Sequence, residues 1–321
     1  MTDFSDATVR PPVTFDGQVA VVTGAGRGLG RLYAIDLAQR GAAVIVNDIG
    51  GTMGGDGSDA SVAAAVVAEI EAAGGRAVAN HESVDTPEGG QAIVDCAVSS
   101  FGRLDVVVSN AGIFQTLPFE DITAHDWQRM RQVHLDGAFY LAQPAYRVMK
   151  TQDYGRFVMI ASSAGLFGQP LAAHYSAAKA GVFGLTNVIA AEGATHGILA
   201  NAVLPFGQSR MVWETTGERA PDDEGASFIG AIRPELVVPI VTYLASRACT
   251  FSHHNYSAGG GRFARVFAGL GAGWLAPDGA QPTADDIQAH LDEVSVTEPF
   301  TVPMSIVDEV IEICTRLGIA R

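Results

Sequence analysis

VAVVTGAGRGLG, residues 19–30, decides the fold of this chain. Its apolar run Val19 to Val22 is typical of a buried strand, and a glycine-rich turn follows immediately. Gly24 would serve the turn, while Gly28 and Gly30 would allow close approach to a phosphate and close helix packing. The amides at the start of the next helix would then face that phosphate, which indicates a dinucleotide loop. The alternative is a plain strand-to-helix turn.

Short apolar runs alternate with helical patterns along most of the chain. Further strands are expected at 43–46, 76–79, 104–108, 157–161 and 199–204, and helices at 32–39, 60–73, 126–149 and 174–193. Fully apolar strands separated by helices predict a parallel sheet covered on both faces. Right-handed crossovers would wind it into an α/β fold, a Rossmann-like doubly wound sheet.

The last stretch of the chain differs from this pattern. Glycine clusters interrupt it from residue 259 onward, and amphipathic helices are expected at 283–294 and 305–317. We therefore expect a dinucleotide-binding and catalytic domain at 1–260. Residues 261–321 would form a C-terminal extension that packs on the same domain or at a subunit interface.

Composition narrows the classes of function. The 321 residues carry a formal net charge of −15, and an acidic surface repels nucleic acid and anionic membranes. The three cysteines show no disulfide or zinc spacing, which favours a reducing, cytoplasmic location. Residues 1–12 hold no apolar run typical of a signal peptide, and no stretch is apolar enough to span a bilayer.

Asp48 stands at the end of the second expected strand, about 20 residues after Gly28. A carboxylate there accepts hydrogen bonds from the adenosine ribose and repels a 2′-phosphate, which favours NAD over NADP. Arg27 in the glycine loop favours NADP instead, because a guanidinium pairs with a phosphate. Asp48 stands where the choice is usually made, so NAD is the expected cofactor; the alternative is an ordinary turn aspartate.

Two further segments end expected strands beside the same crevice. Asn110-Ala111-Gly112 follows the fourth strand, at the edge of a parallel sheet where ligands bind. Ser83-Val84 follows the third strand and would flank the adenine. Ordinary loop chemistry is an equal alternative for Ser83.

Tyr175 and Lys179 are four residues apart on an expected helix, so their side chains share one face. A free phenol has a pKa near 10, too high for proton transfer at neutral pH, and a nearby ammonium would lower it. Ser162, at the end of the fifth strand, would donate to the substrate oxygen on which negative charge develops. Taken singly, each residue also has a structural explanation; together with the glycine loop they indicate an alcohol dehydrogenase site.

Residues 16–260 resemble the short-chain dehydrogenase/reductase family. The matching pieces are the glycine loop, Asn110-Ala111-Gly112, Ser162 and the Tyr175-Ser176-Ala177-Ala178-Lys179 run. Closer still, residues 46–51, 131–135 and 209–211 resemble the dehydrogenase part of the peroxisomal multifunctional β-oxidation enzymes. That subgroup oxidises 3-hydroxyacyl-CoA thioesters and some hydroxysteroids with NAD.

This resemblance implies roles at matching positions. Tyr175 would be the general base or acid, Lys179 would also bind the nicotinamide ribose, and Ser162 would hold the carbonyl. His134 stands where many members have an asparagine that anchors a relay water, so it is either a relay residue or a buried structural histidine. The implied cofactor residues are Gly24, Arg27, Gly28, Leu29, Gly30, Asp48, Ser83, Val84, Asn110, Ala111, Gly112, Tyr175, Lys179 and Pro205.

The resemblance also bears on substrate and assembly. Pro205-Phe206-Gly207 departs from the usual Pro-Gly, so the nicotinamide-side loop is expected to differ in shape. Residues 211–228 are expected to form a lid, with Trp213 suggesting a hydrophobic alcohol or ketone substrate. A homodimer or homotetramer through the two long helices is expected.

Other readings stay open at this point. A 3-oxoacyl thioester reductase is one alternative, and a catalytically idle NAD-binding scaffold is another; the intact Ser162, Tyr175 and Lys179 set argues against the scaffold. His253 and His254 suggest a metal site, but adjacent strand residues point apart and no ligand partner stands at a suitable spacing. We therefore expect no metal.

Overall fold

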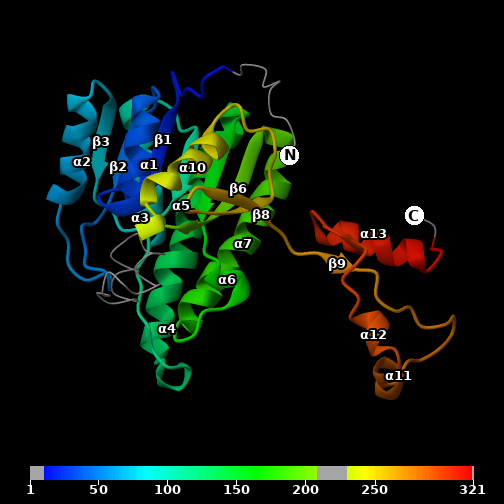
Figure 1. Cartoon of the computed structure of the whole chain (residues 1–321). Helices are drawn as coiled ribbons and strands as arrows, with labels where there is room; N and C mark the ends of the chain where they lie inside the picture. Colours follow the sequence, from blue (N-terminus) through cyan, green and yellow to red (C-terminus); the bar gives the residue numbers. More distant parts are fainter. Residues whose placement is uncertain (1–10, 208–229, 320–321) are drawn as a thin grey trace. The chain divides into compact units, whose positions relative to one another are not determined.

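The computed structural model of the chain describes residues 11–207 and 230–319 (Figure 1). Contacts divide the chain into two units, Met1–Arg265 and Val266–Arg321, which are described separately. In the described part of the chain, no helix is both long enough and apolar enough to cross a membrane.

An eight-stranded sheet in the order β3-β2-β1-β4-β5-β6-β7-β8 forms the centre of the first unit. The strands are β1 Val19–Thr23, β2 Ala43–Asn47, β3 Arg76–Asn80, β4 Val106–Ser109, β5 Gly155–Ile160, β6 Ile198–Phe206, β7 His254–Gly259 and β8 Arg262–Val266. Strands β1 to β7 pair in parallel. The strand order reverses between β1 and β4, and in such sheets the ligand crevice opens at that point. The predicted doubly wound α/β fold is confirmed.

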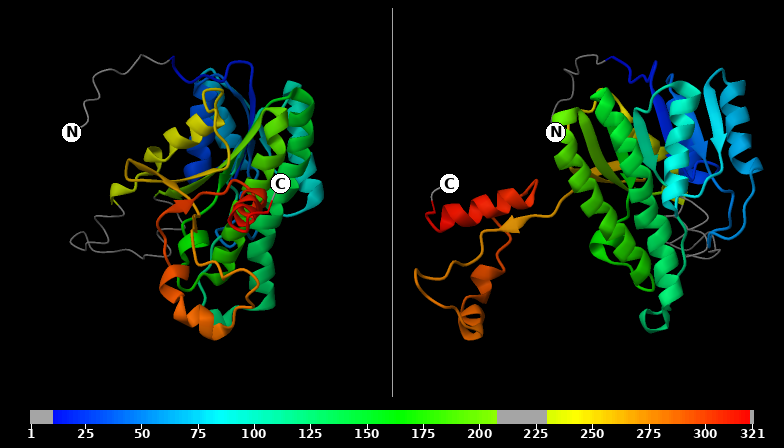
Figure 2. Two further views of the ribbon diagram at one scale, coloured as in Figure 1. Left: turned by 90° about the vertical axis from the view of Figure 1, so that its right-hand side faces the viewer. Right: turned by 180° about the vertical axis from the view of Figure 1, so that it is seen from behind.

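Helices cover both faces of this sheet (Figure 2). One layer holds α1 Gly28–Gln39, α2 Ser61–Ala72 and α10 Val238–Ala245; the other holds α3 Pro87–Phe101, α5 Gly137–Gln152 and α7 Ala173–Gly193. Strands β1, β2 and β4, at the centre of the sheet, are almost wholly apolar because both of their faces are buried. The core under the first layer includes Tyr33, Leu37, Val44 and Val241, all fully buried.

The helix expected over 126–149 is a composite in the structure. It consists of α4 Ala124–Arg131, a π-helical turn η2 Gln132–Asp136, and α5, which continues through Pro144. The expectation of one regular helix was therefore wrong. A π turn holds one extra residue, and such turns occur mostly where a helix is adapted to a functional site. Here the turn carries His134, which is buried.

Several elements were not predicted. Helix α3 begins with Thr86 as its cap and Pro87 in its first turn, which are helix start signals, but Gly89 and Gly90 weaken its apolar pattern. Strand β7 has the polar sequence HNYSAG and gave no apolar run. The turn between β7 and β8 has positive φ at Gly260 (60°) and Gly261 (80°), as a two-residue hairpin turn requires.

The second unit contains short elements around a two-stranded sheet. They are β9 Leu270–Gly271, α11 Ala284–Ala289, α12 Leu291–Val294, β10 Phe300–Thr301 and α13 Ile306–Arg316. The single helix expected over 283–294 is broken at His290, whose ring stacks on Trp274 with centroids 4.3 Å apart. None of residues 266–319 is buried.

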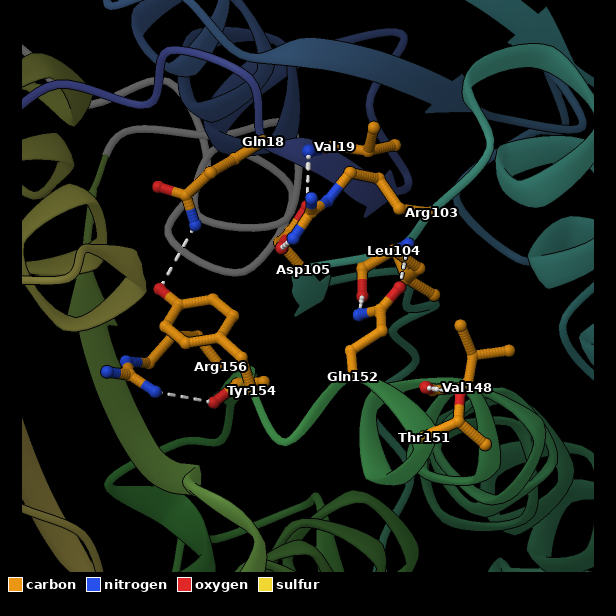
Figure 3. A network of polar contacts seen from close by, with 11 residues as sticks. Gln18, Val19, Arg103, Leu104, Asp105, Val148, Thr151, Gln152, Tyr154 and Arg156 are labelled. Atoms are coloured by element: carbon orange, nitrogen blue, oxygen red, sulfur yellow. Dashed lines mark hydrogen bonds and ion pairs between the residues drawn. The ribbon is translucent and has the colours of Figure 1, made fainter.

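A polar network holds the amino ends of β1, β4 and β5 together, at the edge of the sheet opposite the crevice (Figure 3). Asp105 is fully buried and accepts hydrogen bonds from the Val19 amide (2.9 Å) and from the Arg103 guanidinium (2.6 and 2.7 Å). The Gln152 side chain satisfies both the amide and the carbonyl of Leu104. Three separated segments are thus fixed by bonds to buried polar groups.

This network predicts a specific loss of stability. Asp105→Asn keeps the side-chain shape but removes the charge, so we expect the free energy of unfolding to fall by about 3 kcal/mol. Urea unfolding followed by circular dichroism measures it. The matched control, Glu69→Gln, breaks the exposed Arg31–Glu69 pair (2.6 Å), and its expected loss is below about 1 kcal/mol. Equal losses in the two variants would contradict this account.

Candidate active site

A cavity of about 560 Å³ lies along the carboxyl ends of β1, β2, β4, β5 and β6. Cofactor and small-molecule sites commonly measure about 300–1,000 Å³. All the residues predicted for catalysis or cofactor binding line this cavity: Gly24, Arg27, Gly28, Leu29, Gly30, Asp48, Ser83, Val84, Asn110, Ala111, Gly112, His134, Ser162, Tyr175, Lys179 and Pro205. The structure therefore brings together segments that lie far apart in the sequence.

The glycine loop presents an uncapped helix start to the cavity. Gly24 and Gly28 have φ of 62° and 53°, which favours glycine, and a Cβ at Gly30 would collide with the Gly24 carbonyl. Helix α1 has no side-chain cap and no acidic residue in its first turn. Helices α3 and α4, in contrast, are capped by threonines. The free amides and the positive end of the helix dipole fit a pyrophosphate.

Asp48 both braces this loop and faces the cavity. Its Oδ2 accepts a hydrogen bond from the Gly26 amide (2.8 Å), and its Oδ1 accepts one from the Gly50 amide (2.7 Å). Each carboxylate oxygen accepts more than one hydrogen bond, so capacity for two ribose hydroxyls is left. The cofactor function and the turn function of Asp48, set out above as alternatives, are thus compatible in one geometry.

Asn110 ties the fourth strand to the glycine loop. Its Nδ2 donates to the carbonyls of Thr23 (2.9 Å) and Gly24 (3.2 Å). The amides of Asn110 and Ala111 donate to Thr23 Oγ1. Asn110 therefore positions the loop, while Gly112 lies against the His134 ring, where a Cβ would collide.

Tyr175 and Lys179 lie together on α7, as their spacing predicted. Lys179 Nζ is 5.8 Å from the centre of the Tyr175 ring and donates to the Ile160 carbonyl at 2.6 Å. Phe114 and His134 meet the Tyr175 ring edge to face, with centroids 5.0 and 5.1 Å away. Phe114 and the Ile160 carbonyl had no recognisable sequence signal, because only the tertiary fold brings them to the site.

The sequence predicted a lowered pKa for Tyr175, and this direction is wrong for the protein without a bound cofactor. Burial raises the pKa of this phenol, and the nearby Ser162 hydroxyl offsets only part of the rise. Burial also lowers the pKa of Lys179, to about 7. Both shifts have one cause: the shared site is nearly free of water, so each charged form loses solvation. The phenolate therefore needs a further positive charge beside it.

His134 is buried against the backbone of Ile113. Its Nε2 lies 2.7 Å from the Ile113 carbonyl oxygen and 3.2 Å from the Ile113 amide nitrogen. We assign the proton to Nε2, which donates to the carbonyl oxygen, because that contact is the shorter of the two. Burial, followed by the charge of Lys179, lowers the pKa of His134 well below its usual value, so the ring is neutral near pH 7. Within the described residues Nδ1 has no hydrogen-bond partner. A buried, bare acceptor thus lies beside the Tyr175 ring.

Other predicted features are placed or left open by the structure. Pro205, Phe206 and Gly207 line the cavity. Residues 209–211 and the expected lid at 211–228 lie outside the described residues.

The His254 ring stacks on Phe251 with centroids 4.9 Å apart, and its Nδ1 is 3.1 Å from the Tyr256 hydroxyl. The described residues contain no cluster of three metal-ligating side chains.

With this geometry in place, the chain can be assigned to a class. Residues 18–218 match the family described as short chain dehydrogenase, and the chain belongs to that family. The predicted resemblance is confirmed.

Individual relatives narrow the subgroup. The chain is 44% identical over 264 residues to the peroxisomal multifunctional enzyme type 2 of Mus musculus, a match that covers 82% of this chain and 33% of that protein. It is 40% identical over 280 residues to a short-chain type dehydrogenase/reductase of Mycobacterium tuberculosis, covering 87% of this chain and 94% of that protein. The solved full-length peroxisomal multifunctional enzyme type 2 of Drosophila melanogaster has a TM-score of 0.79 at 30% identity, covering 95% of this chain and 50% of that one. The chain thus spans about a third of the length of the mouse enzyme.

The depressed pKa of Lys179 predicts a pH dependence of stability. An unfolded lysine titrates near 10.5 and the folded one near 7, so between these values the unfolded chain binds more protons and stability rises with pH. Between about pH 7 and about pH 9, the free energy of unfolding of the unmodified chain is expected to rise. In Lys179→Gln this rise is expected to be smaller by about 2 kcal/mol. Urea unfolding at both pH values measures the difference. The exposed Lys150→Gln serves as the control, and an equal gain in all three proteins would rule out the buried ammonium as its source.

Proposed function

We propose that this chain is an NAD-dependent oxidoreductase that interconverts a secondary alcohol and a ketone. A bulky apolar substrate of the 3-hydroxyacyl-CoA or hydroxysteroid type is the leading candidate. The observation that carries the proposal is the position of Tyr175, Lys179 and Ser162 in the same cavity as the uncapped start of α1. The relatives named as multifunctional enzymes support the acyl-CoA substrate.

The residues divide the chemistry between them. In oxidation, the Tyr175 oxygen takes the proton of the substrate hydroxyl, and in reduction it returns that proton. Ser162 donates a hydrogen bond to the substrate oxygen as charge develops there. Bound NAD would accept the hydride from the carbinol carbon, and its positive ring would favour the Tyr175 phenolate that burial disfavours. Lys179 would bind the ribose and add its own charge.

His134 is assigned the position of a water anchor. Its neutral Nδ1 is an acceptor that the described protein leaves bare, close to both Tyr175 and Lys179. A water held there would carry the proton onward from Lys179. This would replace the asparagine-bound water of many family members.

Assembly and location follow as further proposals. Helices α5 and α7 expose large apolar side chains, including Phe139 and Val188, which suits a homodimer or homotetramer. The apolar surface of residues 266–319 is proposed to pack on the first unit or on another subunit. Light scattering on the full chain measures the stoichiometry, and a monomer would overturn this proposal. A cytoplasmic location stays a prediction for cell fractionation to check, since the names of two relatives place those proteins in peroxisomes.

A substrate screen with the Tyr175→Phe variant tests the function. With NAD, 3-hydroxyacyl-CoA, steroid and terpenoid alcohols are screened by NADH absorbance. On the best substrate, loss of the phenolic oxygen is expected to lower kcat/KM by about 10³-fold, because proton transfer fails, while NADH still binds. Turnover that survives in Tyr175→Phe would refute the assigned role. No turnover of any alcohol, with NADH still bound, would favour the idle scaffold.

Two companion variants sharpen this test. Tyr140→Phe makes the same chemical change on α5, outside the cavity lining, and is expected to leave turnover unchanged. His134→Leu removes the Nδ1 acceptor. Reduced turnover with normal NADH binding supports the relay, whereas normal turnover makes His134 a structural residue.

Cofactor choice is tested at Asp48. The unmodified chain is expected to bind NADH at least about tenfold more tightly than NADPH, because the carboxylate repels a 2′-phosphate. Asp48→Ala is expected to weaken NADH binding and to narrow that ratio, measured by fluorescence titration. Tighter binding of NADPH by the unmodified chain would mean that Arg27 outweighs Asp48, and Arg27→Gln would then lower the NADPH affinity.

A further inference from the structure

Residues 49–59 form an ordered loop across the cavity, here named the strap. It connects β2 to α2 and carries its own hydrogen bonds: the Asp59 amide donates to the Ile49 carbonyl (2.8 Å), and the Thr52 amide donates to the Asp56 carbonyl (2.8 Å). Residues of the strap line the cavity, among them Gly51, Met53 and Gly55. The strap is therefore a shaped wall of the site.

Two hydrogen bonds join the strap to the far wall in the described part of the chain. The Met53 carbonyl accepts from the Phe114 amide at 3.2 Å, and the Gly55 carbonyl accepts from Arg129 Nη2 at 2.9 Å. Phe114 follows β4, and Arg129 lies on α4, so both belong to the opposite side of the crevice. A third bond, from Arg27 Nη1 to the Gly51 carbonyl (3.3 Å), joins the strap to the glycine loop. Because the strap continues into β2 and α2 at its ends, the two bonds to the far wall are the ones that hold its middle across the crevice.

Arg129 is itself held in place by a carboxylate. Its Nη1 pairs with Asp85 Oδ2 at 2.7 Å, and the Ser83 hydroxyl donates to the other oxygen of that carboxylate at 2.6 Å. The side chains of Arg129 and Asp85 are only 29% and 18% exposed, so water screens this pair less than a surface pair. Arg129, Asp85 and Ser83 all line the cavity.

Gly55 shows that the contact is close. Its φ is 88°, and a Cβ there would come within 2.7 Å of Arg129 Nη2 and 2.9 Å of Ile113 Cγ2. The backbone of the strap thus approaches the guanidinium as closely as a glycine allows. Pairing with Asp85 alone would not require a glycine at position 55, so the close approach indicates a contact between Arg129 and the strap itself.

We propose that Arg129 is a positioning residue that latches the strap across the adenosine side of the crevice and thereby sets how fast the dinucleotide leaves. The proposal rests on the proposed function, because it takes a dinucleotide as the ligand. Release requires the strap to open, and opening breaks the Arg129 bond to Gly55. Without that bond the open form is more populated, so dissociation is faster.

The test is the dissociation rate of NADH, measured by stopped-flow displacement with excess NAD. Arg129→Gln is expected to raise this rate about tenfold, equivalent to about 1.4 kcal/mol, and to leave the KM of the alcohol unchanged. The matched control is Arg131→Gln, which loses the Arg131–Asp136 pair (3.2 Å) outside the cavity lining, and its rate is expected to equal that of the unmodified chain. A rate in Arg129→Gln equal to that of the control would overturn the latch.

Two further measurements separate the latch from the proposed function and from misfolding. If the unmodified chain binds neither NADH nor NADPH, the proposed function fails before the latch is tested. Hydrogen exchange of peptide 49–59 in the dinucleotide-free protein needs no ligand: faster exchange in Arg129→Gln than in Arg131→Gln supports the latch, and equal exchange opposes it. Should Arg129→Gln not fold, Arg129→Lys takes its place, because an ammonium keeps the positive charge beside Asp85 but lacks the planar fork that reaches Asp85 and the Gly55 carbonyl together. Faster exchange of peptide 49–59 in Arg129→Lys than in Arg131→Gln supports the latch, and equal exchange opposes it.

Discussion

The hydrogen bonds between Asn110-Ala111 and Thr23-Gly24 are the constraint on which the site depends. Four hydrogen bonds join the carboxyl ends of β1 and β4, the two strands at which the strand order reverses. The glycine loop continues from Thr23-Gly24. The segment Gly112-Ile113, which contacts His134, continues from Asn110-Ala111. If these two strand ends moved apart, the glycine loop and the Tyr175–Lys179 pair would no longer face one cavity.

Burial away from water explains the pKa shifts of Tyr175 and Lys179. Tyr175 and Lys179 are both buried. Burial raises the pKa of the phenol and lowers the pKa of the ammonium, so the neutral form of each group is favoured. A site in this state holds no strong base by itself. A positive charge placed beside the phenol would favour the phenolate, so in the proposed function cofactor binding and proton transfer are linked through one low-dielectric pocket.

The same fold places a different kind of residue at the opposite side of the crevice. In the proposed function the strap, Arg129 and Asp85 take no part in hydride or proton transfer, yet they line the cavity proposed to hold the dinucleotide. Their interactions are an ion pair and backbone hydrogen bonds, which break and re-form more readily than the buried packing around β1 and β4. Rigid walls and a less stable loop are therefore combined in one site.

The sequence by itself determined the alternation of strands and helices, the glycine loop, Asp48 and the Tyr175–Lys179 spacing, because these depend on local periodicity and on residues a few positions apart. It failed where local signals conflict with tertiary context. The polar strand β7 is stabilised by pairing with β6, and the π turn at His134 interrupts a pattern that reads as one helix. The direction of the Tyr175 pKa was decided by burial, which no spacing reveals. Arg129, Phe114 and the Ile160 carbonyl entered the site only through tertiary structure, because the folding of the sheet brings the carboxyl ends of strands distant in sequence to one edge.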